Sequence, residues 1–149
     1  FGQGFTEKEQ RKVDSLLAVI RQPKHDTSLA SAYVDLSTML AYTNWDTVFV
    51  LCNKAVAVAE KGLKTHKNGP ESRAFKQTLS KAFVNLGYVN SYWGKNDLAL
   101  EYNWRSLKIK EQLADKRGIS TLYLNIGAVY YDIGDIASAL EYFSKSARM

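Results

Sequence analysis

The residue types that most often carry out chemistry are scarce in this chain of 149 residues. It has two histidines, His25 and His66, and one cysteine, Cys52. Two histidines are too few for a His-rich metal site, and the chain contains no H-E-x-x-H or C-x-x-C motif. Both histidines fall near predicted loops, and neither has an acidic residue at helical spacing on a shared face. The sequence therefore predicts no metal site and no cofactor.

The remaining candidates for a catalytic group have simpler structural explanations. Cys52 lies on an apolar stripe, which predicts a buried, inert thiol rather than a nucleophile, and a single cysteine excludes an internal disulfide. The segment Gly2-Gln3-Gly4 is not a phosphate-binding loop, because no strand precedes it and no third glycine follows. Asp132 and Asp135 flank a predicted turn, where Asp commonly caps the next helix. We therefore expect a protein that is not an enzyme.

Composition favours a soluble globular domain. Apolar residues make up 46% and charged residues 23% of the chain, close to the average for such proteins, so it can bury a core. The longest apolar runs, residues 48–52 and 55–59, are far shorter than the ~20 residues needed to cross a bilayer. The net charge is +5, but acidic residues interrupt the basic clusters, whereas a nucleic-acid binder usually has a denser basic stripe. Most charges are therefore interpreted as solvated helix faces.

The spacing of apolar residues predicts helices throughout. Stripes of 3.6-residue period run through residues 6–22, 29–40, 48–63, 75–89, 98–113, 119–133 and 136–143. Thr6 and Glu9 fit a capping box at the first helix, and Pro70 fits the first turn of the fourth. The prediction is an all-α chain of seven helices, whose short connections make neighbouring helices antiparallel.

An internal repeat of 40 residues covers the second half of the chain. The run Ala99-Leu100-Glu101-Tyr102 recurs as Ala139-Leu140-Glu141-Tyr142. The other pairs 40 residues apart are Asn85 and Asn125, Leu86 and Ile126, Gly87 and Gly127, Gly94 and Gly134, and Ser106 and Ser146. The small residues would let helix backbones approach closely where two helices cross.

These positions resemble the tetratricopeptide repeat (TPR). That pattern has a small residue in the first helix (Gly87, Gly127), a turn glycine (Gly94, Gly134) and a small residue in the second helix (Ala99, Ala139). The resemblance implies an α-solenoid, a right-handed superhelical stack of antiparallel helix pairs with about three repeats and an N-terminal helix. The implied boundaries are an N-terminal segment and capping helix over 1–24 and three hairpins within 25–149, at about 27–63, 70–113 and 116–149.

Two repeats depart from the pattern. In the first, Ser37 replaces the first-helix glycine and one residue is missing at the turn, so its helices should cross less closely. In the second, Asn90 and Asn103 stand where Tyr130 and Phe143 match the aromatic core pair of the family. We expect these two amides to face each other and to hydrogen-bond, since a buried amide without a partner is costly.

The resemblance also implies a concave binding face, formed by the first helix of each repeat and suited to a protein or an extended peptide. The residues mapped to it are Tyr42, Lys81, Asn85, Tyr88, Tyr92, Asn125, Tyr131 and Asp132, with Asp35, Thr38, Thr121 and Ala128 beside them. Asn amides can pair with a peptide backbone, and Tyr supplies apolar area with a polar tip. The other reading of these residues is structural, with Tyr in the core and Asn bonded within a repeat. The carboxyl-terminus clamp of the family needs several basic groove residues, of which only Lys81 is present.

Residues 115–119 and 13–17 are similar to the TPR sensor regions of bacterial signalling proteins, of the histidine kinase or cyclase type. The resemblance implies a periplasmic or otherwise extracytoplasmic interaction module, with a membrane span elsewhere in a longer protein. A first residue other than Met and a last hairpin without a capping helix fit this expectation. The alternatives are a cytoplasmic TPR scaffold or peptide receptor and, less favoured, a basic helical-repeat nucleic-acid binder. The uncapped last hairpin also predicts self-association.

Overall fold

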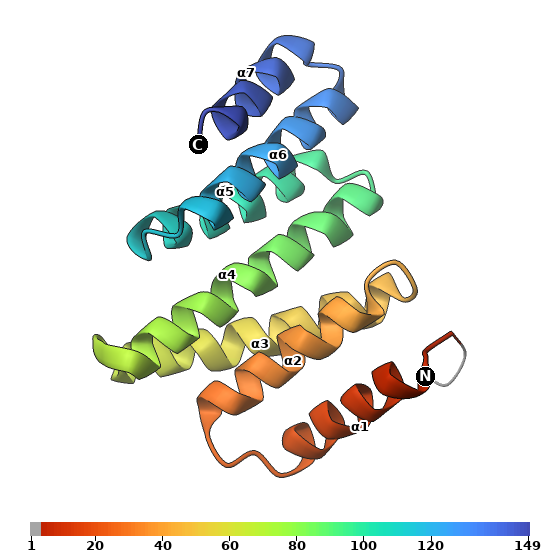
Figure 1. The fold of residues 1–149 in the computed structure, drawn as a ribbon, viewed down its shortest axis with the longest axis vertical. Helices are drawn as coiled ribbons and strands as arrows, with labels where there is room; N and C mark the ends of the chain where they lie inside the picture. The colour runs from red at the N-terminus through yellow and green to blue at the C-terminus, as the bar shows by residue number, and fades with distance from the viewer. Residues whose placement is uncertain (1–3) are drawn as a thin grey trace. The chain divides into compact units, whose positions relative to one another are not determined.

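The computed structural model describes residues 4–149, so most of the segment Gly2-Gln3-Gly4 lies outside the described residues. In that range the chain is all-α, with seven helices and no strand, and adjacent helices pack as pairs (Figure 1). The helices are α1 (Glu7–Arg21), α2 (Asp26–Leu40), α3 (Trp45–Thr65), α4 (Gly69–Tyr92), α5 (Asn96–Gln112), α6 (Lys116–Ile133) and α7 (Ile136–Ala147). The prediction of an all-α helical repeat is therefore confirmed. None of these helices is long and apolar enough to cross a membrane.

The chain divides into two compact units, the first ending at Thr78 and the second covering Leu79–Met149. In the first unit α1 packs on α2, and α2 packs on α3. The predicted capping box begins α1: the backbone N–H of Glu9 donates to Thr6 Oγ1 at 3.3 Å, and the backbone N–H of Thr6 donates to Glu9 Oε2 at 2.7 Å. The largest side chains buried in this unit are Val13, Val34, Leu36, Leu40, Val48 and Phe75.

In the second unit α5 packs on α6, and α6 packs on α7. Its core comes from the apolar stripes that the sequence shows, including Phe83, Leu86, Leu122, Ile126 and Val129. Two turns of this unit need glycine, because Gly94 and Gly134 have φ values of +72° and +88° in the left-handed region. The backbone N–H of Gly134 closes the end of α6 on the carbonyl of Tyr131 at 3.0 Å. Both predicted turn glycines thus serve a backbone requirement.

Candidate binding face

The small first-helix residues lie against the second helix of the same repeat, as predicted. A Cβ added to Gly87 would lie 3.1 Å from Nδ2 of Asn103, and one added to Gly127 would lie 2.6 Å from Cε1 of Phe143. The side chain of residue 103 therefore packs against Gly87, and that of residue 143, 40 residues later, packs against Gly127. The absent side chain makes room for the crossing partner.

The first repeat uses a polar pair at the equivalent place. Ser37 stands where the glycine is in the other repeats, and Cys52 is the counterpart of Asn103. Cys52 is fully buried, and its thiol donates to Ser37 Oγ at 3.2 Å. The predicted burial of Cys52 is confirmed, and the contact gives that thiol a packing role.

The prediction that Asn90 and Asn103 bond to each other is wrong. Both are buried, but Asn90 Nδ2 donates to the Leu86 carbonyl at 2.7 Å, and Asn103 Nδ2 donates to the Ala99 carbonyl at 2.9 Å. Asn103 Oδ1 is buried and has no hydrogen-bond partner. Each amide thus turns back to the carbonyl four residues earlier in its own helix, because that acceptor is within reach of a short side chain.

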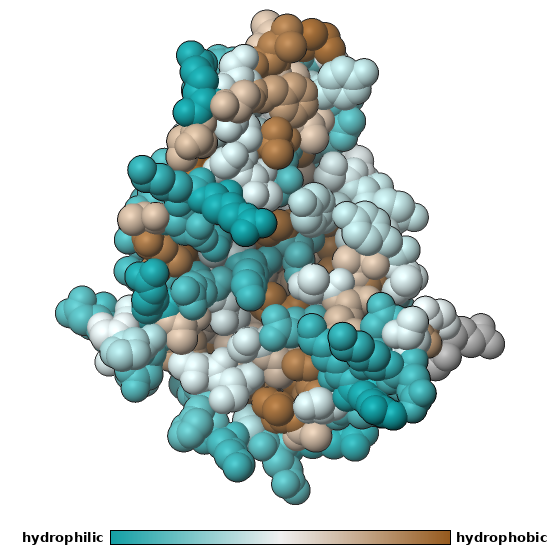
Figure 2. Space-filling model, in the orientation of Figure 1, coloured by the Kyte–Doolittle hydropathy of each residue, from teal (hydrophilic) through white to brown (hydrophobic). Residues whose placement is uncertain are grey.

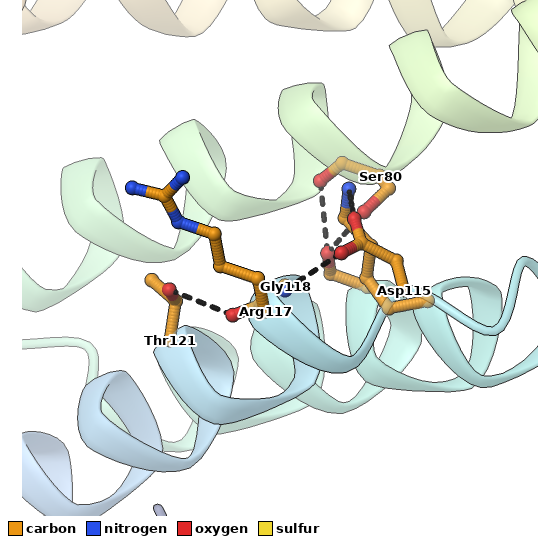
Figure 3. A network of polar contacts seen from close by, with 7 residues as sticks. Ser80, Asp115, Arg117, Gly118 and Thr121 are labelled. Carbon is orange, nitrogen blue, oxygen red and sulfur yellow. Dashed lines mark hydrogen bonds and ion pairs between the residues drawn. The ribbon is translucent and has the colours of Figure 1, made fainter. Parts of the chain in front are cut away.

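Hydroxyl pairs join the two helices in both repeats of the second unit, one pair buried and the other half-buried. The Ser80 and Ser106 hydroxyls are 2.7 Å apart, and Ser106 Oγ also donates to the Ser80 carbonyl at 2.9 Å (Figure 3). Forty residues later, the Ser120 and Ser146 hydroxyls are 2.9 Å apart, and Ser146 Oγ donates to the Ser120 carbonyl at 2.9 Å. These contacts repeat the same pairing at the same place in two hairpins.

Asp115 fixes the start of α6 beside this pair (Figure 3). Its side chain accepts from Lys110 Nζ at 2.8 Å and from the backbone N–H of Gly118 at 2.9 Å. The hydrogen bond from Lys110, followed by that from Gly118, holds the pKa of the Asp115 carboxyl below its ordinary value. A Cβ on Gly118 would lie 2.7 Å from Asp115 Oδ2, so the glycine leaves room for the carboxylate.

The first helices of the two repeats in the second unit are linked by Tyr88 and Asn125. Tyr88 Oη, from α4, donates to Asn125 Oδ1, from α6, at 3.1 Å. Asn125 Nδ2 is buried and has no hydrogen-bond partner. Two of the residues expected on the binding face are therefore in direct contact, and one of them retains an unused donor.

The other residues expected on this face differ in exposure. Tyr92 and Tyr131 are 67% and 62% exposed, Lys81 and Asp132 are exposed, and Asn85 is half-buried. Thr121 Oγ1 donates to the Arg117 carbonyl of its own helix at 3.1 Å. Since Tyr92 and Tyr131 are mostly solvated, their interpretation as core residues does not hold, whereas Thr121 is bonded within its own helix.

In the first unit Tyr42 is 78% exposed and its ring meets that of Trp45 edge to face, with centroids 5.2 Å apart. Its φ of +69° is rare for a residue with a bulky side chain. Asp35 and Thr38 bond within α2, where Ser31 Oγ donates to Asp35 at 3.4 Å and Thr38 Oγ1 donates to the Val34 carbonyl at 3.0 Å.

Sequence reasoning missed that both histidines line one pocket. His25, at the start of α2, and His66, at the end of α3, share a cavity of about 380 Å³ with Glu71 and Phe75. The signal was available, because the start of one helix and the end of the next lie at the same end of an antiparallel hairpin. Within residues 4–149 no group of three or more His, Cys, Asp or Glu side chains is arranged to hold a metal ion.

Comparison with known proteins supports a conclusion about the fold alone. No family model matches the chain, and no curated protein matches it. Among solved structures, BtubC (BKLC) from P. vanneervenii is similar over 93% of this chain, with a TM-score of 0.64 and 15% sequence identity. The match covers 53% of the BtubC chain, so this chain spans about half the length of that structure. The chain has a helical-repeat-like fold.

Proposed function

We propose that this chain is a non-catalytic TPR-type module that binds a protein segment or extended peptide on the face formed by α4 and α6. The observation that carries the proposal is the Tyr88–Asn125 pair with its unpartnered Asn125 Nδ2. A buried donor without an acceptor costs about 1–3 kcal/mol. A peptide carbonyl would supply the acceptor and recover that free energy when the amide, which has almost no accessible surface in this structure, turns toward the ligand on binding.

The neighbouring residues favour an extended ligand of low net charge. Tyr88, Tyr92 and Tyr131 offer partly or mostly exposed rings on the first helices of two repeats. Lys81 and Asp132 add one charge of each sign at exposed positions. Tyrosine contributes large contact area at a small entropic cost, and amides suit the repeating N–H and C=O groups of a peptide backbone.

The test begins with selection of peptides from a random library displayed on phage, followed by titration of one selected synthetic peptide. Asn125→Ala should weaken its binding by about tenfold, since the lost bond is worth about 1 kcal/mol or more. The double variant with Asn85→Ala should abolish binding while the circular dichroism spectrum stays unchanged. Asn53→Ala, at an exposed asparagine of α3, is the matched control. Selection of no peptide, or an affinity that both Asn substitutions leave unchanged, would contradict the proposal.

For the biological setting we propose the interaction region of a bacterial signalling protein, outside the cytoplasmic membrane. Its support is the similarity of residues 13–17 and 115–119 to such sensor regions. A cytoplasmic scaffold or peptide receptor of the same fold is the alternative. Reading the coding sequence on both sides of these residues separates them: a secretion signal upstream and a membrane span downstream are expected for the sensor. A steep fall of nucleic-acid binding with salt would instead favour the basic nucleic-acid binder.

A further inference from the structure

The outward face of α7 exposes apolar side chains that an ordinary surface helix would cover. Leu140 is 61% exposed and Ile136 is 49% exposed, and Met149 just beyond the helix is 54% exposed. Apolar surface gathers over the end of the molecule that holds α7 (Figure 2). Isolated exposed apolar residues are common, but Ile136 and Leu140 are one turn apart on the same side of α7, and adjacent exposed apolar side chains indicate an interaction site.

The equivalent position in the preceding repeat is covered by another helix. Leu100 occupies in α5 the position that Leu140 occupies in α7, and it is only 7% exposed. It packs in one cluster with Ile126 and Val129 of α6. Leucine at positions 100 and 140 is thus suited to contact with a helix beyond its own hairpin. Within the described residues no such helix follows α7.

We propose that a second copy of this chain covers the face, with the two α7 helices packed antiparallel about a two-fold axis near Leu140. Ala137, Leu140, Ser144 and Ala147 are spaced by three, four and three residues, the spacing of a helix–helix seam. Ala137, Ser144 and Ala147 are small and exposed, so two such helices can approach closely. With Leu140 on the axis, Ile136 of each copy faces the small Ser144 of the other.

The charges at the two ends of α7 favour this antiparallel orientation. Asp135, exposed, caps the N-terminal end, where its side chain accepts from the backbone N–H of Ser138 at 3.1 Å. Arg148 is exposed at the C-terminal end. Antiparallel packing brings the acidic end of each helix toward the basic end of the other and opposes the two helix dipoles. The Glu141–Lys145 ion pair, at 2.6 Å, is formed within one helix and needs no partner.

Sedimentation equilibrium over a range of protein concentrations tests the proposal. The mass should rise from 16.8 kDa toward twice that value. Leu140→Asp should weaken dimerisation by at least about a hundredfold, because two buried leucines are lost per dimer. Val50→Asp is the matched control, since Val50 is 51% exposed on α3 of the first unit. In dilute solution, where the parent chain is monomeric, thermal unfolding of both variants should match that of the parent chain.

A second measurement tests the two-fold geometry itself. Leu140→Cys should give a dimer when treated with a short bismaleimide, whereas Val50→Cys should not, and the buried Cys52 contributes no background. A mass of 16.8 kDa at every concentration, or dissociation by Val50→Asp in place of Leu140→Asp, would overturn the proposal. The proposal would also be overturned if the chain were a monomer and its α7 bound a synthetic peptide with the sequence of α6. Peptide binding by α4 and α6 is independent of these outcomes.

Discussion

Replacing Asn103 by leucine should stabilise this protein, although it removes a hydrogen bond. Asn103 is 3% exposed, and its Oδ1 has no partner, so the folded chain carries the desolvation cost of that oxygen. Its only side-chain bond is from Nδ2 to the Ala99 carbonyl at 2.9 Å, within its own helix. Leucine has the same branched shape at Cγ and is somewhat larger, and Gly87 presents no side chain on the side that faces it.

The size of the effect follows from the unpaired oxygen. Leaving a buried acceptor unsatisfied costs about 1–3 kcal/mol, while replacing it by an apolar group of the same shape is neutral or stabilising. We therefore expect Asn103→Leu to raise the free energy of unfolding by about 1–2 kcal/mol. In urea denaturation this should raise the midpoint by about 0.5–1 M, with an unchanged slope.

The matched control is Asn53→Leu. Asn53 makes the same type of bond, from Nδ2 to the Phe49 carbonyl at 2.9 Å, but its side chain is exposed. Its substitution should change stability by less than about 0.5 kcal/mol. If Asn103→Leu lowers the free energy of unfolding by 1 kcal/mol or more while Asn53→Leu has no effect, the Asn103 oxygen has a partner and the reasoning fails.

Two further predictions concern close packing and pH. Gly62→Ala should lower the free energy of unfolding, measured in urea, by about 1–2 kcal/mol, because the new Cβ would overlap the buried Phe75 ring. Gly87→Ala should be nearly neutral, and Phe75→Leu should rescue Gly62→Ala. Equal effects of the two glycine substitutions would contradict this prediction. Because the folded pKa of Asp115 is below the ordinary 3.8, the carboxylate stabilises the fold above that pH and loses its effect as the pH falls through the lower folded value. Asp115→Asn should therefore lower Tm at pH 7 and have a much smaller effect near pH 2; an equal loss of Tm at both would refute the role of its charge.

Helix positions and packing were predictable because they depend on local spacing. The 3.6-residue stripes placed seven helices, and the matched Gly87 and Gly127 located the close crossings that the structure contains. The turn glycines were predictable for a similar reason, since Gly94 and Gly134 occupy left-handed backbone that other residues rarely adopt. These features are each set by a few residues close together in the sequence.

Side-chain partners were harder to predict because each polar group has several acceptors within reach. The expected bond between Asn90 and Asn103 failed because the carbonyl four residues back in the same helix competes with any partner across the hairpin. The contact of Tyr88 with Asn125 depends on how successive repeats are offset, which the spacing of residues along one helix does not fix. The shared pocket of His25 and His66 required both ends of a hairpin to be considered together.

The hydroxyl pairs restrict how far one helix of each hairpin in the second unit can shift along the other. If α5 moved one turn along α4, the hydrogen bond between the Ser80 and Ser106 hydroxyls would break. Both residues are buried, so no water would replace the lost partner of either hydroxyl. Ser120 and Ser146, which are half-buried, impose a weaker restriction of the same kind on α6 and α7. The first hairpin has Ala30 and Ala55 at the corresponding places, both fully buried, so there the hydrogen bond from the buried Cys52 thiol to Ser37 Oγ is what opposes a shift of α3 along α2.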